Sequence, residues 1–176
     1  MKQFFCSAHK RKIFFPSLLT AGVMIIFSCT KQDTTTITRP VVLPANAITS
    51  TSLKGGSVKG VMLSDSTYTV SGDITVLPSD TLTIQPGATI KVVNNSAFYV
   101  QGTIMSDGAK DKPVVFTTPT RKAGDWGGFQ CDSAKSVTFK WTKILWAGGA
   151  DSSGSPRQTI TVSSPVNVDI EDCWLL

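Results

Sequence analysis

Histidine is almost absent from this chain of 176 residues. The one histidine, His9, lies in the N-terminal segment 1–28, which we interpret below as a leader that is removed. A chain that begins at residue 29 has no imidazole. His-based nucleophilic triads, histidine metal sites and histidine general acid–base catalysis all require one. We therefore predict that the protein is not an enzyme.

Cysteine is also scarce. Of the four cysteines, Cys6 falls within the leader and Cys29 follows it, which leaves Cys131 and Cys173. Two thiolates without histidine cannot complete a structural zinc site, and no glycine-rich phosphate loop links a strand to a helix. The sequence thus predicts no metal and no other cofactor. An oxidising compartment permits a disulfide between Cys131 and Cys173, and the sequence leaves open whether they pair.

The chain lacks a real excess of positive charge. Its formal net charge is +5, from 17 basic and 12 acidic residues. Four basic residues and no acidic residue lie in segment 1–28, so 17 − 4 = 13 basic residues face 12 acidic ones in the remainder. A net charge of +1 is not the electrostatic signature of a protein that binds a polyanion. We therefore exclude nucleic acid as a partner.

The chain has one long apolar run, residues 13–27, and it follows a basic segment. The run is short for a membrane span, and the sequence turns polar directly after it. This pattern predicts a signal peptide over residues 1–28, with an uncleaved signal anchor as the alternative.

The end of the leader, Ile26-Phe27-Ser28-Cys29, resembles the lipobox of bacterial lipoproteins, although Phe27 departs from the small residue usual at its position. The resemblance implies that the Cys29 thiol receives diacylglycerol, that the leader is cut before Cys29, and that a fatty acid such as palmitate acylates the new amino terminus. It also implies an outer-membrane lipoprotein of the cell envelope, with exposure at the cell surface left open. Several acyl chains on one residue give durable membrane anchoring.

Residues 29–52 are rich in threonine and poor in aromatic residues, and Pro40 and Pro44 interrupt them. Such a segment buries too little apolar surface to order itself, so we expect a flexible tether. The folded domain is predicted to span residues 53–176.

The domain shows apolar residues that alternate with polar ones, which is typical of strands with one buried face. The pattern is clear at Tyr68 and Val70, Ile74 and Val76, Leu82 and Ile84, Ile90 and Val92, Val137, Phe139 and Trp141, Ile160 and Val162, and Val166, Val168 and Ile170. No helical periodicity competes with it, so the fold class is predicted to be all-β.

Internal spacing indicates how the sheet closes. Leu82 to Ile104 spans 22 residues, Val76 to Phe98 spans 22 (with Val100 as the alternative partner), and Ile90 to Val114 spans 24. Three strands in each step suit one coil of a three-sided solenoid, in which successive coils stack through parallel pairing. A β-sandwich is the alternative.

Residues 68–150 resemble, in order, the opening coils of bacterial cell-surface lipoproteins with a β-helix repeat domain. The matching segments include Thr81-Leu-Thr-Ile-Gln-Pro-Gly-Ala-Thr-Ile-Lys91, Trp126-Gly-Gly-Phe129 and Phe139-Lys-Trp-Thr-Lys-Ile-Leu-Trp-Ala-Gly-Gly149. The resemblance implies a short right-handed, single-stranded parallel β-helix of few coils after a disordered tether. Function does not follow from it, because that fold carries lyases, hydrolases, adhesins and inert spacers alike.

Candidate site residues are few. Asp169 and Glu171 alternate with apolar residues on one strand and are weak catalytic candidates as a carboxylate pair. The stronger interpretation is an ordinary ion pair between Asp169 and Lys140, which the spacing places opposite each other in neighbouring coils. Trp126 is a possible ligand-stacking residue, although the two glycines after it favour a structural role. The segment 107–111 has too few ligands for calcium and reads as a polar turn.

We expect the core to come mainly from Leu82, Ile84, Ile90, Val92, Ile104, Val115, Phe116, Phe129, Val137, Phe139, Ile160, Val168 and Ile170, with Val115 and Phe116 unable both to point inward unless the chain bends. The end of the chain shows no polar cap after Cys173. We therefore expect the domain to be truncated, or its last coil to be covered by self-association or by another protein.

Our leading hypothesis is a non-enzymatic, lipid-anchored cell-envelope protein that displays a β-helix for adhesion or glycan contact. Its expected partners are the membrane and a glycan or protein ligand. The alternative is a polysaccharide-processing β-helix lyase or hydrolase, or a fragment of one.

Overall fold

The computed structural model describes residues 42–163 and 166–176. The predicted signal peptide, the predicted lipidation site Cys29 and most of the predicted tether lie outside these residues. Within the described ranges, no helix has both the length and the apolar character that a membrane span requires.

The described residues form seventeen strands and three parallel sheets, and every strand pairing is parallel. The first sheet contains β1 (Ala47–Ile48), β4 (Gly60–Met62), β7 (Thr81–Ile84), β10 (Thr103–Asp107), β13 (Ser136–Lys140) and β16 (Asn167–Glu171). The second contains β2 (Ser52–Leu53), β5 (Thr67–Val70), β8 (Thr89–Val92), β11 (Val114–Thr117), β14 (Thr142–Ile144) and β17 (Trp174–Leu175). The third contains β3 (Gly56–Ser57), β6 (Ile74–Val76), β9 (Phe98–Val100), β12 (Phe129–Gln130) and β15 (Ile160–Thr161).

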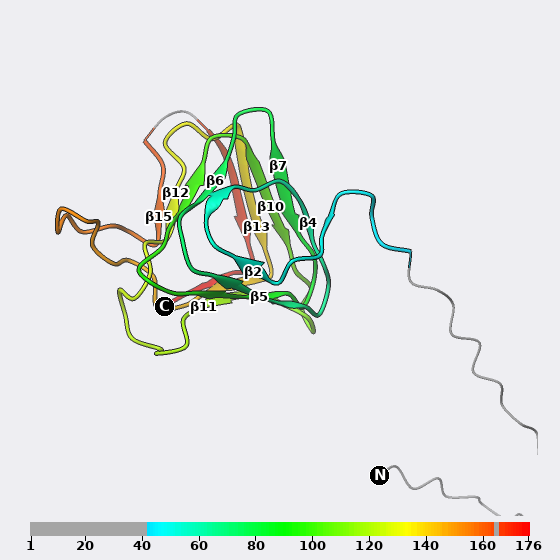
Figure 1. Ribbon diagram of the computed structural model, residues 1–176, viewed down its shortest axis with the longest axis horizontal. Coiled ribbons are helices and arrows are strands. Elements are labelled where there is room, and N and C mark those ends of the chain that lie inside the picture. The colour runs from blue at the N-terminus through cyan, green and yellow to red at the C-terminus, as the bar shows by residue number, and fades with distance from the viewer. Residues whose placement is uncertain (1–41, 164–165) are drawn as a thin grey trace, which may run out of the picture. The chain divides into compact units, whose positions relative to one another are not determined.

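Every third strand along the chain stacks on the same sheet, so three successive strands make one turn of a solenoid. Figure 1 shows the three sheets as the walls of a triangular prism. The predicted fold class is therefore confirmed: the domain is a short right-handed parallel β-helix.

The solenoid begins earlier than the sequence predicted. The tether was expected to run to residue 52, but Ala47 pairs with Val61, and Leu53 pairs with Val70. Ile48 and Leu53 are partly buried against the core of the next coil. The composition of this segment was misleading because a terminal coil is stabilised by backbone pairing with its neighbour and needs few apolar side chains of its own.

The alternation of apolar residues correctly predicted most of the core. Nine of the thirteen predicted residues are buried: Leu82, Ile84, Ile90, Val92, Ile104, Phe116, Phe129, Val137 and Phe139. Val115 is wrong, because Val114 and Phe116 point inward from β11 and Val115 lies between them on the opposite face.

The last coil accounts for the other three errors in the predicted core. Val168 and Ile170 pair with Val137 and Phe139 and share their inward direction, yet they are 42% and 45% exposed. Ile160 is only partly buried. These side chains cover the coil beneath them, and within the described residues no further coil covers them in turn.

The apolar side chains of Trp174 and Leu175 point to opposite faces of the second sheet. Leu175 pairs with the buried Ile144 and therefore faces the core side, whereas Trp174 pairs with Lys143 and faces outward. The ammonium nitrogen of Lys143 lies 5.1 Å from the centre of the Trp174 ring. Trp174 is thus an outer-wall residue and not part of the open end of the core.

Candidate functional site

A polar column runs along the outer face of the third sheet. Tyr99 pairs with Gln130, and Gln130 pairs with Thr161, so the three residues stack across three successive coils. Their neighbours Phe98 and Phe129 are fully buried. Because side chains alternate along a strand, Tyr99, Gln130 and Thr161 point outward.

A loop rises beside this column between β14 and β15, and it projects from the solenoid wall (orange in Figure 1). An isolated antiparallel bridge between Ala150 and Pro156 narrows its base. The carboxylate of Asp151 accepts hydrogen bonds from the Ser153 hydroxyl and from the backbone amides of Ser153 and Ser155. These bonds, that of the Ser153 hydroxyl first, lower the pKa of Asp151 and hold the loop tip with an ionised carboxylate.

Arg157 returns from this loop to the column. Its Nη2 donates to the hydroxyl oxygen of Tyr99 at 2.9 Å, and its guanidinium carbon lies 6.0 Å from the centre of the Tyr99 ring. A second nitrogen, Nη1, donates to the carbonyl oxygen of Asn95 at 3.5 Å. The planar guanidinium is thereby held at one end of the column.

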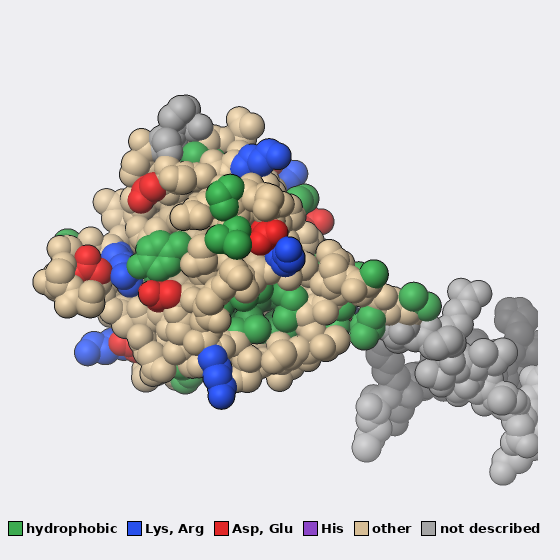
Figure 2. Space-filling model, turned by 45° about the horizontal axis from the view of Figure 1, so that its top comes forward, with side chains coloured by type: hydrophobic (Ala, Val, Ile, Leu, Met, Phe, Trp, Pro, Cys, Tyr) green, Lys and Arg blue, Asp and Glu red, His purple; other side chains and the backbone are tan. Residues whose placement is uncertain are grey.

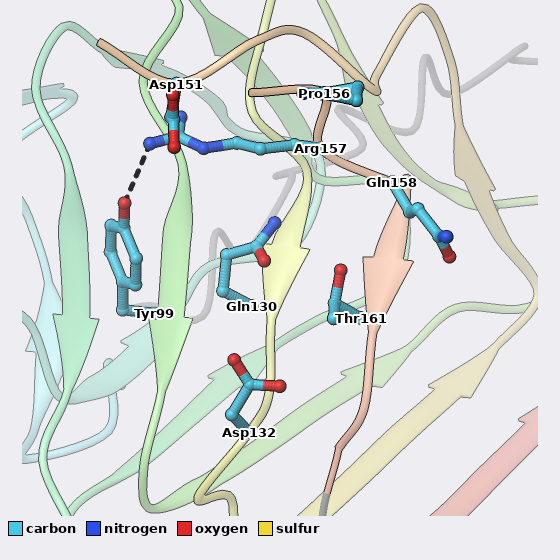
Figure 3. Close-up of a pocket in the computed structure, with 8 residues that line it drawn as sticks. All are labelled: Tyr99, Gln130, Asp132, Asp151, Pro156, Arg157, Gln158 and Thr161. Atoms are coloured by element: carbon cyan, nitrogen blue, oxygen red, sulfur yellow. Dashed lines mark hydrogen bonds between the residues drawn. The ribbon is translucent and has the colours of Figure 1, made fainter. Parts of the chain in front are cut away.

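These residues enclose a groove of about 360 Å³, lined by Tyr99, Gln130, Asp132, Asp151, Pro156, Arg157, Gln158 and Thr161. Figure 3 shows Arg157 extending above Tyr99 and Gln130, with Asp132 at the opposite end of the site. A second hollow of about 180 Å³ shares Tyr99, Gln130 and Asp132 and continues toward Gln101 and Ser133. The two hollows form one polar groove, with the Arg157 guanidinium and the Asp151 carboxylate at one end and the Asp132 carboxylate further along.

The groove offers several kinds of hydrogen-bonding group. Gln130 and Gln158 each carry an amide, Thr161 and Tyr99 carry hydroxyls, and Arg157 carries a cationic donor. Asp132 accepts a hydrogen bond from the hydroxyl of Ser163. Such a surface is suited to a ligand with many hydroxyl groups.

The predicted carboxylate pair lies on a different wall. Asp169 and Glu171 point outward from β16 in the first sheet, and Lys140 contacts both, at 3.6 Å and 3.1 Å. The hydrogen bond from Lys140 to Glu171 is the main cause that raises the pKa of Lys140. The two carboxylates are thus partners of one ammonium group on an exposed surface, as the ion-pair interpretation predicted. The predicted register was wrong by two residues: Asp169 lies opposite Thr138, and Lys140 lies opposite Glu171, with which it makes the shorter contact.

Trp126 is not available for ligand stacking. It is fully buried, and its indole Nε1 donates to the carbonyl oxygen of Leu145 at 2.9 Å. Its ring lies 6.2 Å from Phe116 and 5.6 Å from Phe129, measured between ring centres. The structural interpretation was the correct one, because the indole belongs to an aromatic cluster inside the solenoid.

The remaining candidates show no ligand chemistry. Cys131 and Cys173 are both free thiols, so the disulfide that the sequence left open is not formed. Among the described residues there is no cluster of three or more metal-ligating side chains, and the turn near Asp107 is closed by backbone hydrogen bonds between Ala109 and Lys112.

Sequence reasoning missed the groove. Its floor comes from strands of three successive coils. Arg157 lies 58 residues along the chain from its partner Tyr99. The signal that could have found it is the register: once Phe98, Phe129 and Ile160 are aligned, Tyr99, Gln130 and Thr161 fall into one outward column.

On the face shown in Figure 2, lysine and arginine side chains are interspersed with acidic ones among a largely uncharged surface. This mixture agrees with the small net charge calculated without the leader, and no extended basic patch appears on that face.

Comparison with known proteins supports the parallel β-helix fold. Residues 55–139 match the family model described as a pectate-lyase-like β-helix domain. Over an alignment of 92 residues, the chain is 38% identical to the protein named bark beetle from Drosophila melanogaster. The alignment covers 47% of this chain and 3% of that protein's length. No solved structure matches. The chain therefore contains a parallel β-helix repeat domain, which over residues 55–139 is similar to that family.

Proposed function

We propose that this protein is a lipid-anchored component of a bacterial cell envelope that displays a β-helix and contacts a glycan through the groove of the third sheet. The groove between Tyr99 and Asp132 is the observation that carries the proposal. The lipobox-like segment ending at Cys29 supports the anchor.

The chemistry of the groove favours a glycan over an apolar ligand. Amide, hydroxyl and guanidinium groups follow one another along the wall, and strands of neighbouring coils are spaced about 4.8 Å apart. A sugar chain lying across the coils would meet donors and acceptors at each step. Its hydroxyl groups would replace the water that hydrates Gln130 and Thr161.

The first experiment measures binding of the full-length chain, in detergent solution, to a panel of immobilised polysaccharides. The Arg157→Ala variant is expected to weaken binding to any retained polysaccharide by about tenfold or more, because it removes a charged donor from the groove. Gln130→Ala should weaken the same interaction to a smaller extent. Lys54→Ala, which removes an exposed cation outside the groove, is the matched control. Unchanged binding by both groove variants would contradict the proposal.

The anchor has its own test. In detergent phase separation, the wild-type chain from bacterial membranes is expected in the detergent phase, and Cys29→Ser is expected in the aqueous phase. Mass spectrometry of the N-terminal peptide checks that the difference comes from acyl groups on residue 29. Equal recovery of both forms in the aqueous phase would show that no lipid anchor is attached.

Polysaccharide processing is the second candidate, because the matching family model is named for pectate lyases. We expect no turnover when acidic polysaccharides are screened for new reducing ends and unsaturated products. Turnover that Asp132→Ala abolishes would place a catalytic carboxylate in the groove, whereas turnover that Asp169→Ala abolishes would place it on the first sheet. Either result would replace the non-enzymatic role.

A further inference from the structure

A separate hollow lies on another wall of the solenoid, where the second sheet meets the loop of residues 118–125. Its volume is about 280 Å³, and it is lined by Lys91, Thr117, Thr118, Pro119 and Arg121. It shares none of these residues with the groove of the third sheet.

The strand register explains why two of these residues face the hollow. Thr117 of β11 pairs directly with Lys91 of β8. Their neighbours Phe116 and Ile90 also pair with each other, and both are fully buried. Lys91 and Thr117 therefore stand side by side on the outer face of the wall.

The loop supplies the second cation. It leaves the solenoid after β11 and projects from the corner before β12 (yellow-green in Figure 1). Arg121 adopts a left-handed backbone conformation, with φ at 52°, and its amide donates to the carbonyl oxygen of Thr118 at 3.3 Å. This turn brings Arg121 back to the wall on which Lys91 lies.

The charges in this hollow are not neutralised. Lys59, Lys112 and Lys140 each form a salt bridge, but within the described part of the chain neither Lys91 nor Arg121 does. No acidic side chain lines the hollow. The one acidic residue of the loop, Asp125, accepts a hydrogen bond from the Thr120 hydroxyl and lines an adjoining hollow that shares Thr118 and Pro119 with this one.

We propose that this hollow is an anion-binding site for a tetrahedral oxyanion, such as the phosphate or sulfate group of a larger molecule. Lys91 approaches from the wall and Arg121 from the loop. The Thr117 hydroxyl beside Lys91 donates to the carbonyl oxygen of Thr118 at 3.4 Å, and on binding an anion it would turn toward the hollow. An ammonium group on the wall and a guanidinium group on the loop together carry enough donors to contact three or more oxygens, which a tetrahedral group offers and a planar carboxylate does not. Arginine adds a planar pair of donors that suits phosphate.

The test is calorimetric titration of the full-length chain, in a neutral detergent at low ionic strength, with inorganic phosphate, sulfate and acetate. Phosphate and sulfate are expected to bind, and acetate is expected to bind at least about tenfold more weakly. Lys91→Gln and Arg121→Gln should each lower phosphate affinity about tenfold or more. Lys110→Gln makes the same charge change at an exposed lysine outside the hollow and should leave the affinity unaltered.

Two further probes distinguish the possible carriers of the group. Binding of a soluble sugar phosphate would identify a phosphorylated glycan, whereas binding only to vesicles that contain phosphatidylglycerol, and not to phosphatidylcholine vesicles, would identify a lipid headgroup. Arg157→Ala, which tests the groove, should not alter phosphate binding, so either proposal can fail alone. Absence of phosphate binding, equal binding of acetate, or an equal loss in Lys110→Gln would overturn the anion site.

Discussion

Replacement of Trp126 by alanine is expected to lower the free energy of unfolding by about 3–5 kcal/mol, the range typical of Trp→Ala and Phe→Ala changes in protein cores. The side chain is fully buried. Removing it opens a cavity between Phe98, Phe116 and Phe129, whose rings lie 5.6–6.3 Å from the indole. The change also leaves the carbonyl oxygen of Leu145 without its donor. Denaturant unfolding of the full-length chain measures the loss.

Two other variants separate the contribution of ring packing from that of the hydrogen bond to Leu145. They also give a result if Trp126→Ala does not fold. Trp126→Phe keeps an aromatic ring in the cluster but loses the hydrogen bond, so we expect a smaller cost of about 1–3 kcal/mol. Trp174→Ala removes an indole that is 44% exposed on the outer wall and should cost less than about 1 kcal/mol. Equal losses at Trp126 and Trp174 would mean that Trp126 does not support the core.

The fold could be predicted because each coil of a solenoid repeats the same short pattern of strands and turns in the sequence. Alternating apolar residues identified the strands, and the spacing of 22 residues from Leu82 to Ile104 matches their observed pairing. Gly87, which follows Pro86 at the corner between β7 and β8, has a positive φ of 79°. A side chain there would also collide with the carboxylate of Asp65 in the preceding coil.

The register between strands was harder to predict than the direction in which each side chain points. The sequence aligned Ile90 with Val114, but Ile90 pairs with Phe116; it left Phe98 and Val100 open as partners of Val76, and Val100 is the observed one. In both cases the two alignments differ by two residues. Because side chains alternate with a period of two, a shift of two residues keeps every buried residue inside. Only the length of the turns distinguishes the two alignments, and turn length varies from coil to coil.

The same ambiguity concealed both candidate sites. The outward residues of a strand are polar whichever register is chosen, so the alternation gave no reason to group Tyr99 with Gln130. Loops complete both sites: Arg157 reaches the groove from the loop after β14, and Arg121 reaches the anion hollow from the loop after β11. Loop conformation depends on specific hydrogen bonds, such as those of Asp151, which periodicity does not reveal.

Alkylation of the Cys131 thiol at pH 8 is expected to be about a thousandfold slower in the folded chain than in denaturant. Burial, with a smaller contribution from the negative charge of Asp132, raises the pKa of Cys131 from 9.0 to about 12. The thiolate is the reactive species, and its population at pH 8 falls about tenfold for each unit by which the pKa rises. Restricted access inside the solenoid slows the reaction further.

The measurement is peptide-resolved mass spectrometry after timed treatment with iodoacetamide, with and without guanidinium. Cys173 is the internal comparison: burial also raises its pKa, but its side chain is only partly buried, so it should react faster than Cys131 in the folded chain. Both peptides should be fully alkylated in denaturant without a reducing agent, because both thiols are free. Failure of both to react until a reductant is added would show a Cys131–Cys173 disulfide. A folded-state rate for Cys131 within tenfold of the denatured rate would show that this thiol is not held inside the core.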